Sequence, residues 1–89
     1  MMYPYMILAD ETEIVHSHLI EEDNLKKVEV HFERAINNGF DVARCSLPTY
    51  TWIIREGFSD DEIIQFEQFL KSNAHLIYRF AERGGMSCA

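Results

Sequence analysis

Residues 28–47 read VEVHFERAINNGFDVARCSL, and this stretch decides the fold. Apolar and polar residues alternate on both sides of Asn38-Gly39, and Asn-Gly readily adopts the positive φ angles of a tight type I′ turn. We therefore predict a β-hairpin whose two-residue loop is Asn38 and Gly39. In that register Phe32 lies opposite Cys45. One face of the hairpin is apolar, and it consists of Val28, Val30, Phe32, Ala43, Cys45 and Leu47.

Further strands are predicted around this hairpin. Residues 3–8 and 14–20 have strand character, and in 14–20 apolar residues occur at both alternating sets of positions, so either face can be the buried one. The first hairpin strand spans residues 26–34. Pro48 cannot donate to a β-ladder and ends the second hairpin strand. Residues 50–54 are β-branched and aromatic, which fits either a short fifth strand or a packed connector.

A long helix is predicted after the strands. Ser59 and Glu62 have the spacing of a capping box, and Phe58 and Ile63 occupy the two positions of a hydrophobic staple. Gly84 is placed to end the helix. Asn73 falls on the apolar stripe, so the helix either bends there or uses Asn73 to bond a buried backbone group. The stripe consists of Ile63, Phe66, Phe69, Leu70, Leu76, Ile77 and Phe80.

These elements predict the fold class α+β. A chain of 89 residues supports one hydrophobic core. Strands followed by one helix indicate an antiparallel β-meander of four to five strands packed on one long C-terminal α-helix. We expect a single α+β domain over residues 1–83 and a flexible C-terminal tail over residues 84–89.

The charge distribution limits the class of partner. The net charge is −7, and the first 24 residues contain six acidic residues and no Lys or Arg. Nucleic acids and anionic membranes are bound by basic groups that displace counterions. The sequence therefore argues against direct binding to nucleic acid or membrane and favours a protein partner with a basic surface.

A cytoplasmic location is expected from the same sequence. No apolar run approaches the roughly 18–20 residues that span a bilayer, and the first residues lack the basic region of a secretory signal. Cys45 lies in a strand and Cys88 in the expected tail, which does not form a disulfide framework. We expect two free thiols, with Cys45 as a core residue.

Three histidines suggest a metal site as one alternative. His16 and His18 are two residues apart on one predicted strand and project to the same face. His31 lies on that face too if Val15 and Leu19 point toward the core. Neutral imidazoles together with a carboxylate, here Glu29 or Glu33 beside His31, can bind zinc or another divalent metal, and an open coordination position on the metal would activate water. The competing interpretation is an ordinary solvated face of an amphipathic sheet.

Candidate partner-binding residues lie at acidic turns and on an aromatic face. Aromatic side chains are enriched at interface cores, so the face that carries the tyrosines resembles a binding or dimer surface. The alternative is that the connector 49–57 folds back and covers this face. The candidate residues are Tyr3, Tyr5, Asp10, Glu11, Glu21, Glu22 and Asp23.

The sequence favours a small acidic protein-interaction module without a catalytic residue or cofactor. Such a module could be an inhibitor, an antitoxin-like regulator or an accessory subunit of a nucleic-acid-processing protein. An acidic surface can compete with nucleic acid for a basic groove on such a protein. A metal-binding protein or metal-dependent hydrolase using His16, His18 and His31 is one alternative. A self-associating structural domain, forming a homodimer through the sheet, is another.

Overall fold

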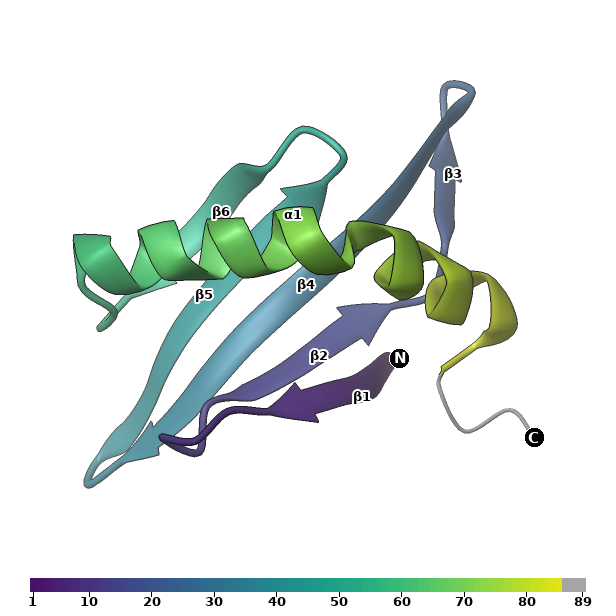
Figure 1. Ribbon diagram of the computed structural model, residues 1–89. Helices are drawn as coiled ribbons and strands as arrows, with labels where there is room; N and C mark the ends of the chain where they lie inside the picture. Colours follow the sequence, from purple (N-terminus) through teal and green to yellow (C-terminus); the bar gives the residue numbers. More distant parts are fainter. Residues whose placement is uncertain (86–89) are drawn as a thin grey trace.

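The computed structural model describes residues 1–85 as one sheet and one helix (Figure 1). The predicted α+β class is confirmed. The elements are β1 (Met2–Ile7), β2 (Glu13–Ser17), β3 (Ile20–Glu22), β4 (Leu25–Ile36), β5 (Gly39–Leu47), β6 (Thr51–Glu56) and α1 (Asp60–Arg83).

The sheet is antiparallel, with strand order β1-β2-β4-β5-β6. The short strand β3 pairs with the beginning of β4 and lies off this path. Helix α1 crosses one face of the sheet, and no other described element covers the opposite face (Figure 1). The meander of neighbouring strands is therefore as expected, with β3 as an additional short strand.

The register of the β4–β5 hairpin differs from the prediction. Ile36 pairs with Gly39, so the loop is Asn37-Asn38, and Phe32 lies opposite Ala43 rather than Cys45. The displacement is two residues, which leaves every side chain on its predicted face because the side-chain period of a strand is two. The expected apolar face is accordingly buried: its six members are each at most 1% exposed.

An ion pair accounts for the observed register. Arg34 now lies directly opposite Asp41, and Nη2 of Arg34 is 2.8 Å from Oδ2 of that carboxylate. The predicted register would have placed Arg34 opposite alanine. Gly39, with φ 154°, begins β5 instead of closing the loop, so the expected type I′ turn is absent at this position.

A two-residue turn with two positive φ angles occurs in the neighbouring hairpin. Asp23 and Asn24 connect β3 to β4 with φ angles of 50° and 66°. Positive φ at both central residues is the requirement of a type I′ turn, and Asp and Asn tolerate it best after glycine.

The connector after Pro48 forms a sixth strand. β6 pairs with β5 over Thr51–Glu56, with a bulge opposite the step from Arg44 to Cys45. It extends the sheet sideways. The segment therefore does not fold back over the second face of the sheet.

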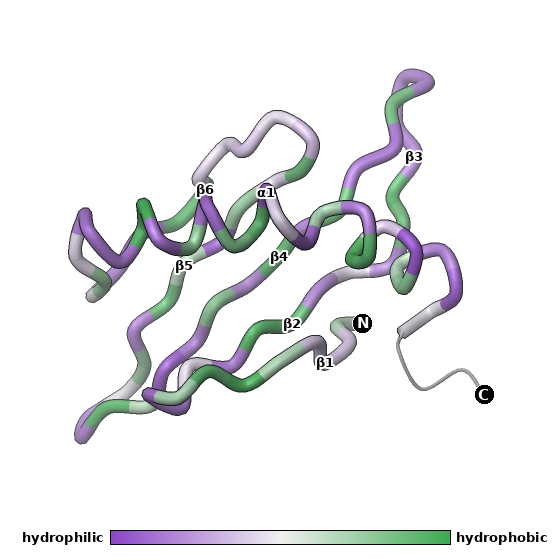
Figure 2. Tube along the Cα trace, in the orientation of Figure 1, coloured by the Kyte–Doolittle hydropathy of each residue, from purple (hydrophilic) through white to green (hydrophobic). Residues whose placement is uncertain are grey.

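The helix begins and ends where predicted. Ser59 and Glu62 form the capping box, Phe58 and Ile63 are buried, and Gly84 is the C-cap with φ 76°. The rings of Phe32 and Phe66 stack with centroids 4.2 Å apart, joining the sheet to the helix. Figure 2 shows hydrophobic and hydrophilic residues alternating along the strands behind α1. Within the described chain, no helix is long and apolar enough to cross a membrane.

Asn73 has a structural role inside the helix. Its Nδ2 donates to the carbonyl of Phe69 at 2.9 Å, and its Oδ1 accepts a hydrogen bond from the hydroxyl of Tyr5 at 2.7 Å. The helix continues through this position to Arg83. Of the two predicted outcomes, Asn73 therefore bonds a backbone group.

The expected tail is described only at its start. Gly84 caps the helix, and Gly85 is buried beside Tyr3, with its backbone N–H donating to the carbonyl of Phe80 at 2.8 Å. Residues 86–89, which include Cys88, lie outside the described residues.

Candidate functional site

The three predicted metal ligands are not brought together. Ile14 pairs with Phe32 and His16 pairs with Val30, so His16 faces the helix and is fully buried. His31 alternates with Val30 and Phe32 and lies on the opposite face. The condition for a shared histidine face, that Val15 points toward the core, is not met, because the larger side chain of Ile14 is buried against Phe32 instead.

His16 is a core residue with one unpaired nitrogen. Its Nδ1 lies 2.8 Å from the carbonyl oxygen of Ser17, and its ring is 5.7 Å from that of Tyr3. Nε2 is buried without a partner in the described structure. His18 is exposed beyond the end of β2. Within residues 1–85, no three His, Cys, Asp or Glu side chains are grouped to hold a metal ion.

The predicted aromatic face is largely internal. A bulge between Pro4 and Met6 turns Tyr5 toward the helix, where it is 8% exposed and its ring contacts Phe69 and Phe80 at centroid distances of 6.0 Å. The expectation that Tyr5 is exposed was therefore wrong. Tyr3 is half-buried beside His16.

The predicted acidic turns lie at opposite ends of the molecule. Asp10 and Glu11 connect β1 to β2, near the start of α1, whereas residues 21–23 lie at the β3–β4 hairpin near its other end (Figure 1). Glu21 pairs across this hairpin with Lys26, which offsets part of its charge. The sequence therefore grouped charges that the fold separates.

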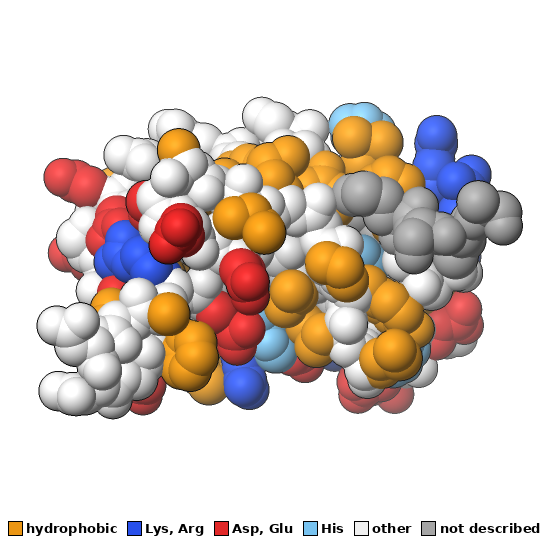
Figure 3. Space-filling model, turned by 90° about the horizontal axis from the view of Figure 1, so that it is seen from below, with side chains coloured by type: hydrophobic (Ala, Val, Ile, Leu, Met, Phe, Trp, Pro, Cys, Tyr) orange, Lys and Arg blue, Asp and Glu red, His pale blue; other side chains and the backbone are white. Residues whose placement is uncertain are grey.

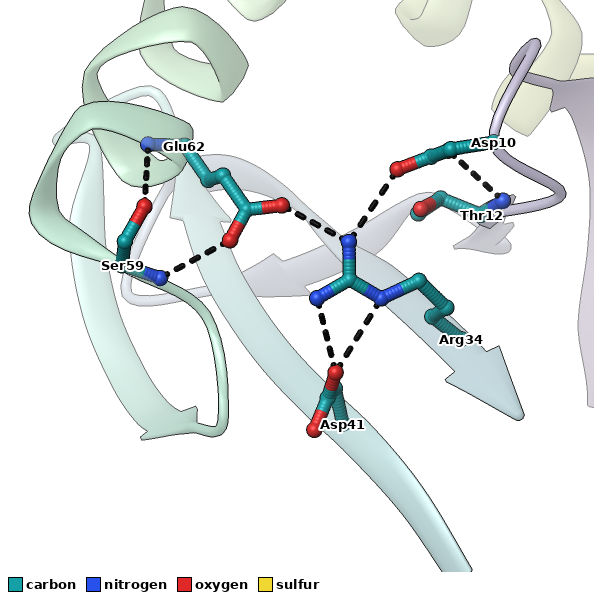
Figure 4. A network of polar contacts seen from close by, with 6 residues as sticks. All are labelled: Asp10, Thr12, Arg34, Asp41, Ser59 and Glu62. Atoms are coloured by element: carbon teal, nitrogen blue, oxygen red, sulfur yellow. Dashed lines mark hydrogen bonds and ion pairs between the residues drawn. The ribbon is translucent and has the colours of Figure 1, made fainter. Parts of the chain in front are cut away.

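An arginine at the first of these ends holds three carboxylates (Figure 4). Nη1 of Arg34 donates to Asp10 at 3.1 Å and to Glu62 at 2.7 Å, while Nε and Nη2 donate to Asp41 at 3.1 and 2.8 Å. The guanidinium carbon also lies 4.7 Å from the centroid of the Phe58 ring. The Arg34 side chain thus joins four parts of the fold: the β1–β2 turn, β4, β5 and α1.

The network shifts the pKa values of Glu62, Asp10 and Arg34. The pKa of Glu62 is lowered by the Ser59 backbone N–H and then by Arg34. Hydrogen bonds from Thr12, and then Arg34, lower the pKa of Asp10. The carboxylates in turn raise the pKa of Arg34. All of these groups are therefore charged near neutral pH.

Gly57 is required beside this network. Its φ is 90°, and a Cβ atom there would overlap the carboxylate of Asp41. Asp41 is 8% exposed and tied to Arg34, so it has little freedom to move. Glycine is thus needed both for the backbone conformation and for space.

Sequence reasoning missed this network, although a signal was present. Arg34 and Asp41 stand at core-facing positions of the two hairpin strands, in step with Val30, Phe32 and Ala43. A charge on a buried face requires a partner. Two opposite charges on the apolar face therefore predict an ion pair and, with it, the hairpin register.

The three carboxylates around Arg34, together with Glu11, Asp60 and Asp61 nearby in the chain, form what we call the acidic end. A hollow of about 380 Å³ beside it lies between the β1–β2 turn and the β4–β5 hairpin. This end lies at the left of Figure 3, where acidic and basic side chains gather, and hydrophobic side chains lie over the middle of the view. The acidic end comprises Asp10, Glu11, Asp41, Asp60, Asp61 and Glu62.

Cys45 is a core thiol, as predicted. It is fully buried, and burial, together with the charge of Glu67, raises its pKa to about 12. A nucleophilic thiolate needs a lowered pKa and exposure. Cys45 has neither property.

No protein-family model, no curated protein and no solved structure matches this chain. Side-chain placement is therefore the basis for assigning a function.

Proposed function

We propose that this protein is a non-enzymatic interaction domain whose acidic end binds a basic surface of another protein. The observation that carries the proposal is the charge excess there. The cations seen among the described residues of this end are Arg34 and Arg55, and both are already paired, the latter with Asp60 at 2.7 Å. Glu11 and Asp61 are exposed, and neither forms an ion pair within residues 1–85. A basic surface would neutralise these charges.

Exposed apolar side chains beside the acidic end support the proposal. Ile7 is 67% exposed and Phe40 65%, and both line the hollow. Ile36, at the end of β4, is 51% exposed. Interfaces combine apolar anchors with a charged surround, in which charges speed association and the anchors slow dissociation.

A finer form of the proposal is that the basic surface is a nucleic-acid-binding groove. Carboxylates fixed on a rigid framework can occupy such a groove in place of phosphates. The protein would then act as an inhibitor, an antitoxin-like regulator or an accessory subunit of a nucleic-acid-processing protein.

The test compares two variants that change the net charge equally. Glu11→Lys/Asp61→Lys alters the acidic end, and Glu21→Lys/Glu22→Lys alters the distant hairpin. Immobilised proteins are used to capture partners from the native cell, and captured proteins are identified by mass spectrometry. We expect basic partners that are lost with the first variant and retained with the second.

Two results would contradict the proposal: capture of acidic partners, or equal loss with both double variants. The finer form is tested separately by adding duplex DNA or RNA to the purified complex. Displacement of the partner supports competition for a nucleic-acid groove. A complex that nucleic acid leaves intact rules out this form while leaving the interaction itself established.

A further inference from the structure

The sheet face opposite the helix, which we call the open face, carries two adjacent rows of paired residues. Residues in a row are direct neighbours across the strands from β2 to β6. The arginine row is Val15, His31, Arg44 and Ile54. The glutamate row, one step along the strands, is Glu13, Glu33, Val42 and Glu56.

Arg44 lacks a partner on this face. Its Nε is buried without a hydrogen bond, and the guanidinium forms no ion pair within the described chain. His31, its neighbour across the strands, instead lies 3.4 Å from Glu29. The guanidinium group therefore has no carboxylate partner within residues 1–85, and a carboxylate of a bound partner would form a charge-assisted hydrogen bond with it.

The glutamate row carries negative charges and contains no cation. Glu13 and Glu33 lie directly opposite each other, an arrangement in which like charges destabilise a sheet. Neither these carboxylates nor that of Glu56 is ion-paired within residues 1–85. A cation placed over this row would relieve the repulsion.

We propose that the open face binds the open face of a second copy of this chain. A two-fold axis parallel to the rows and midway between them places each arginine row on the other copy's glutamate row. Arg44 then lies over Val42 of the second copy, between its Glu33 and Glu56. The contact is isologous, as in most symmetric dimers. Sheets packed face to face cross at about 30°, so the close contacts are confined to rows near the axis.

Charge complementarity favours a second copy over an unrelated partner. A purely basic surface would neutralise the glutamates but would leave Arg44 facing like charge. A purely acidic surface would do the reverse. The rotated copy supplies both signs at the required spacing, and Val15, Val42 and Ile54 add apolar contact. Glu13 and Glu33 also line the hollow beside the acidic end, but neither row contains the residues varied to test that end, so different variants test the two proposals.

A charge-swap experiment tests the dimer. The full chain and the variants Arg44→Glu, Glu33→Arg and Arg44→Glu/Glu33→Arg are compared by sedimentation equilibrium from micromolar to millimolar concentration. Each single swap should weaken dimerisation by at least about tenfold, the equivalent of losing one charged contact. The double swap should recover most of this loss because the pairs are re-formed with reversed sign.

Glu22→Arg at the β3–β4 turn is the matched control, since it changes the charge as Glu33→Arg does. It should leave dimerisation unchanged, and urea unfolding of each variant verifies that it is folded. A wild-type chain that stays monomeric throughout the concentration range would overturn the proposal. A double variant whose loss of dimer affinity equals the sum of the losses in the two single variants would also overturn it.

Discussion

Replacing Arg34 by methionine removes the cation that joins Asp10, Asp41 and Glu62, while keeping most of the apolar length of the side chain. Three carboxylates from separate parts of the chain then lie close together without compensation. Breaking a partly buried charge pair is costly mainly because the remaining charge stays desolvated. We expect a large loss of stability from this single substitution.

The magnitude follows from the exposure of each partner. The Asp41 side chain is 11% exposed, and losing its hydrogen bonds to a charged donor costs about 1.5–3 kcal/mol. Glu62 and Asp10 are 30% and 50% exposed, so each contributes about 0–1 kcal/mol. The contact with the Phe58 ring adds about 0.5–1 kcal/mol. The free energy of unfolding should therefore fall by about 2–6 kcal/mol, a large part of the total for so small a domain.

Urea unfolding at neutral pH, followed by Trp52 fluorescence, measures this loss. Trp52 is the single tryptophan, and its indole N–H donates to Glu67 at 2.8 Å, so its environment changes on unfolding. Arg55→Met is the control, because its ion pair with Asp60 is exposed and should contribute only about 0–0.5 kcal/mol. If Arg34→Met is no more destabilising than this control, the network does not stabilise the fold.

The wild-type protein and the Arg34→Met variant should differ in how their stability depends on acid pH. The pKa values of Glu62 and Asp10 are lowered in the folded state, so the stability they contribute is present above their unfolded pKa values and is lost as the pH falls through the lower folded ones. The wild-type free energy of unfolding should decline below about pH 4.5. In Arg34→Met the decline should be shallower, since one cause of the lowered pKa values is removed. Equal slopes in the two proteins would contradict this assignment.

Three further predictions concern the core. Phe32→Ala should cost about 3–5 kcal/mol because the ring is fully buried, and near-wild-type stability in urea would show that the core is assigned wrongly. Tyr5→Phe should lower the free energy of unfolding by about 1–2 kcal/mol, since Oδ1 of Asn73 loses its donor; an unchanged urea midpoint would mean that this bond contributes nothing. The third prediction uses a Cys88→Ser variant, in which Cys45 is the single thiol. Cys45 should react with a thiol reagent at pH 8 far more slowly in the folded protein than in urea, because it is buried and its pKa is raised. Rapid reaction of the folded protein would contradict this.

The helix was determined by the sequence because its signals are local. Ser59 and Glu62 are three residues apart, and the apolar stripe repeats at intervals of three and four, so both can be recognised without knowing any distant contact. The buried faces of the hairpin were likewise predictable, since Val30 and Phe32 alternate with charged residues. The strand period alone assigns these faces.

Pairings between distant segments were decided by the tertiary structure. Asn-Gly predicted a hairpin but placed the register two residues away from the observed one, in which Arg34 lies opposite Asp41 and forms an ion pair with it. In β2 both alternating sets of residues were apolar enough to be buried. Packing of Ile14 against Phe32 selected the face, and that choice placed His16 and His31 on opposite sides of the sheet.

The ion pairs at the acidic end show most clearly what could not be predicted from the sequence. Arg34 is 24 positions from Asp10 and 28 positions from Glu62 in the sequence, and local pattern gives no reason to group these residues. Their meeting depends on the sheet register, on the path of the β1–β2 turn and on the position of the helix across the sheet. Side-chain periodicity specifies which face a residue occupies, whereas only the packed elements specify which distant charges share that face.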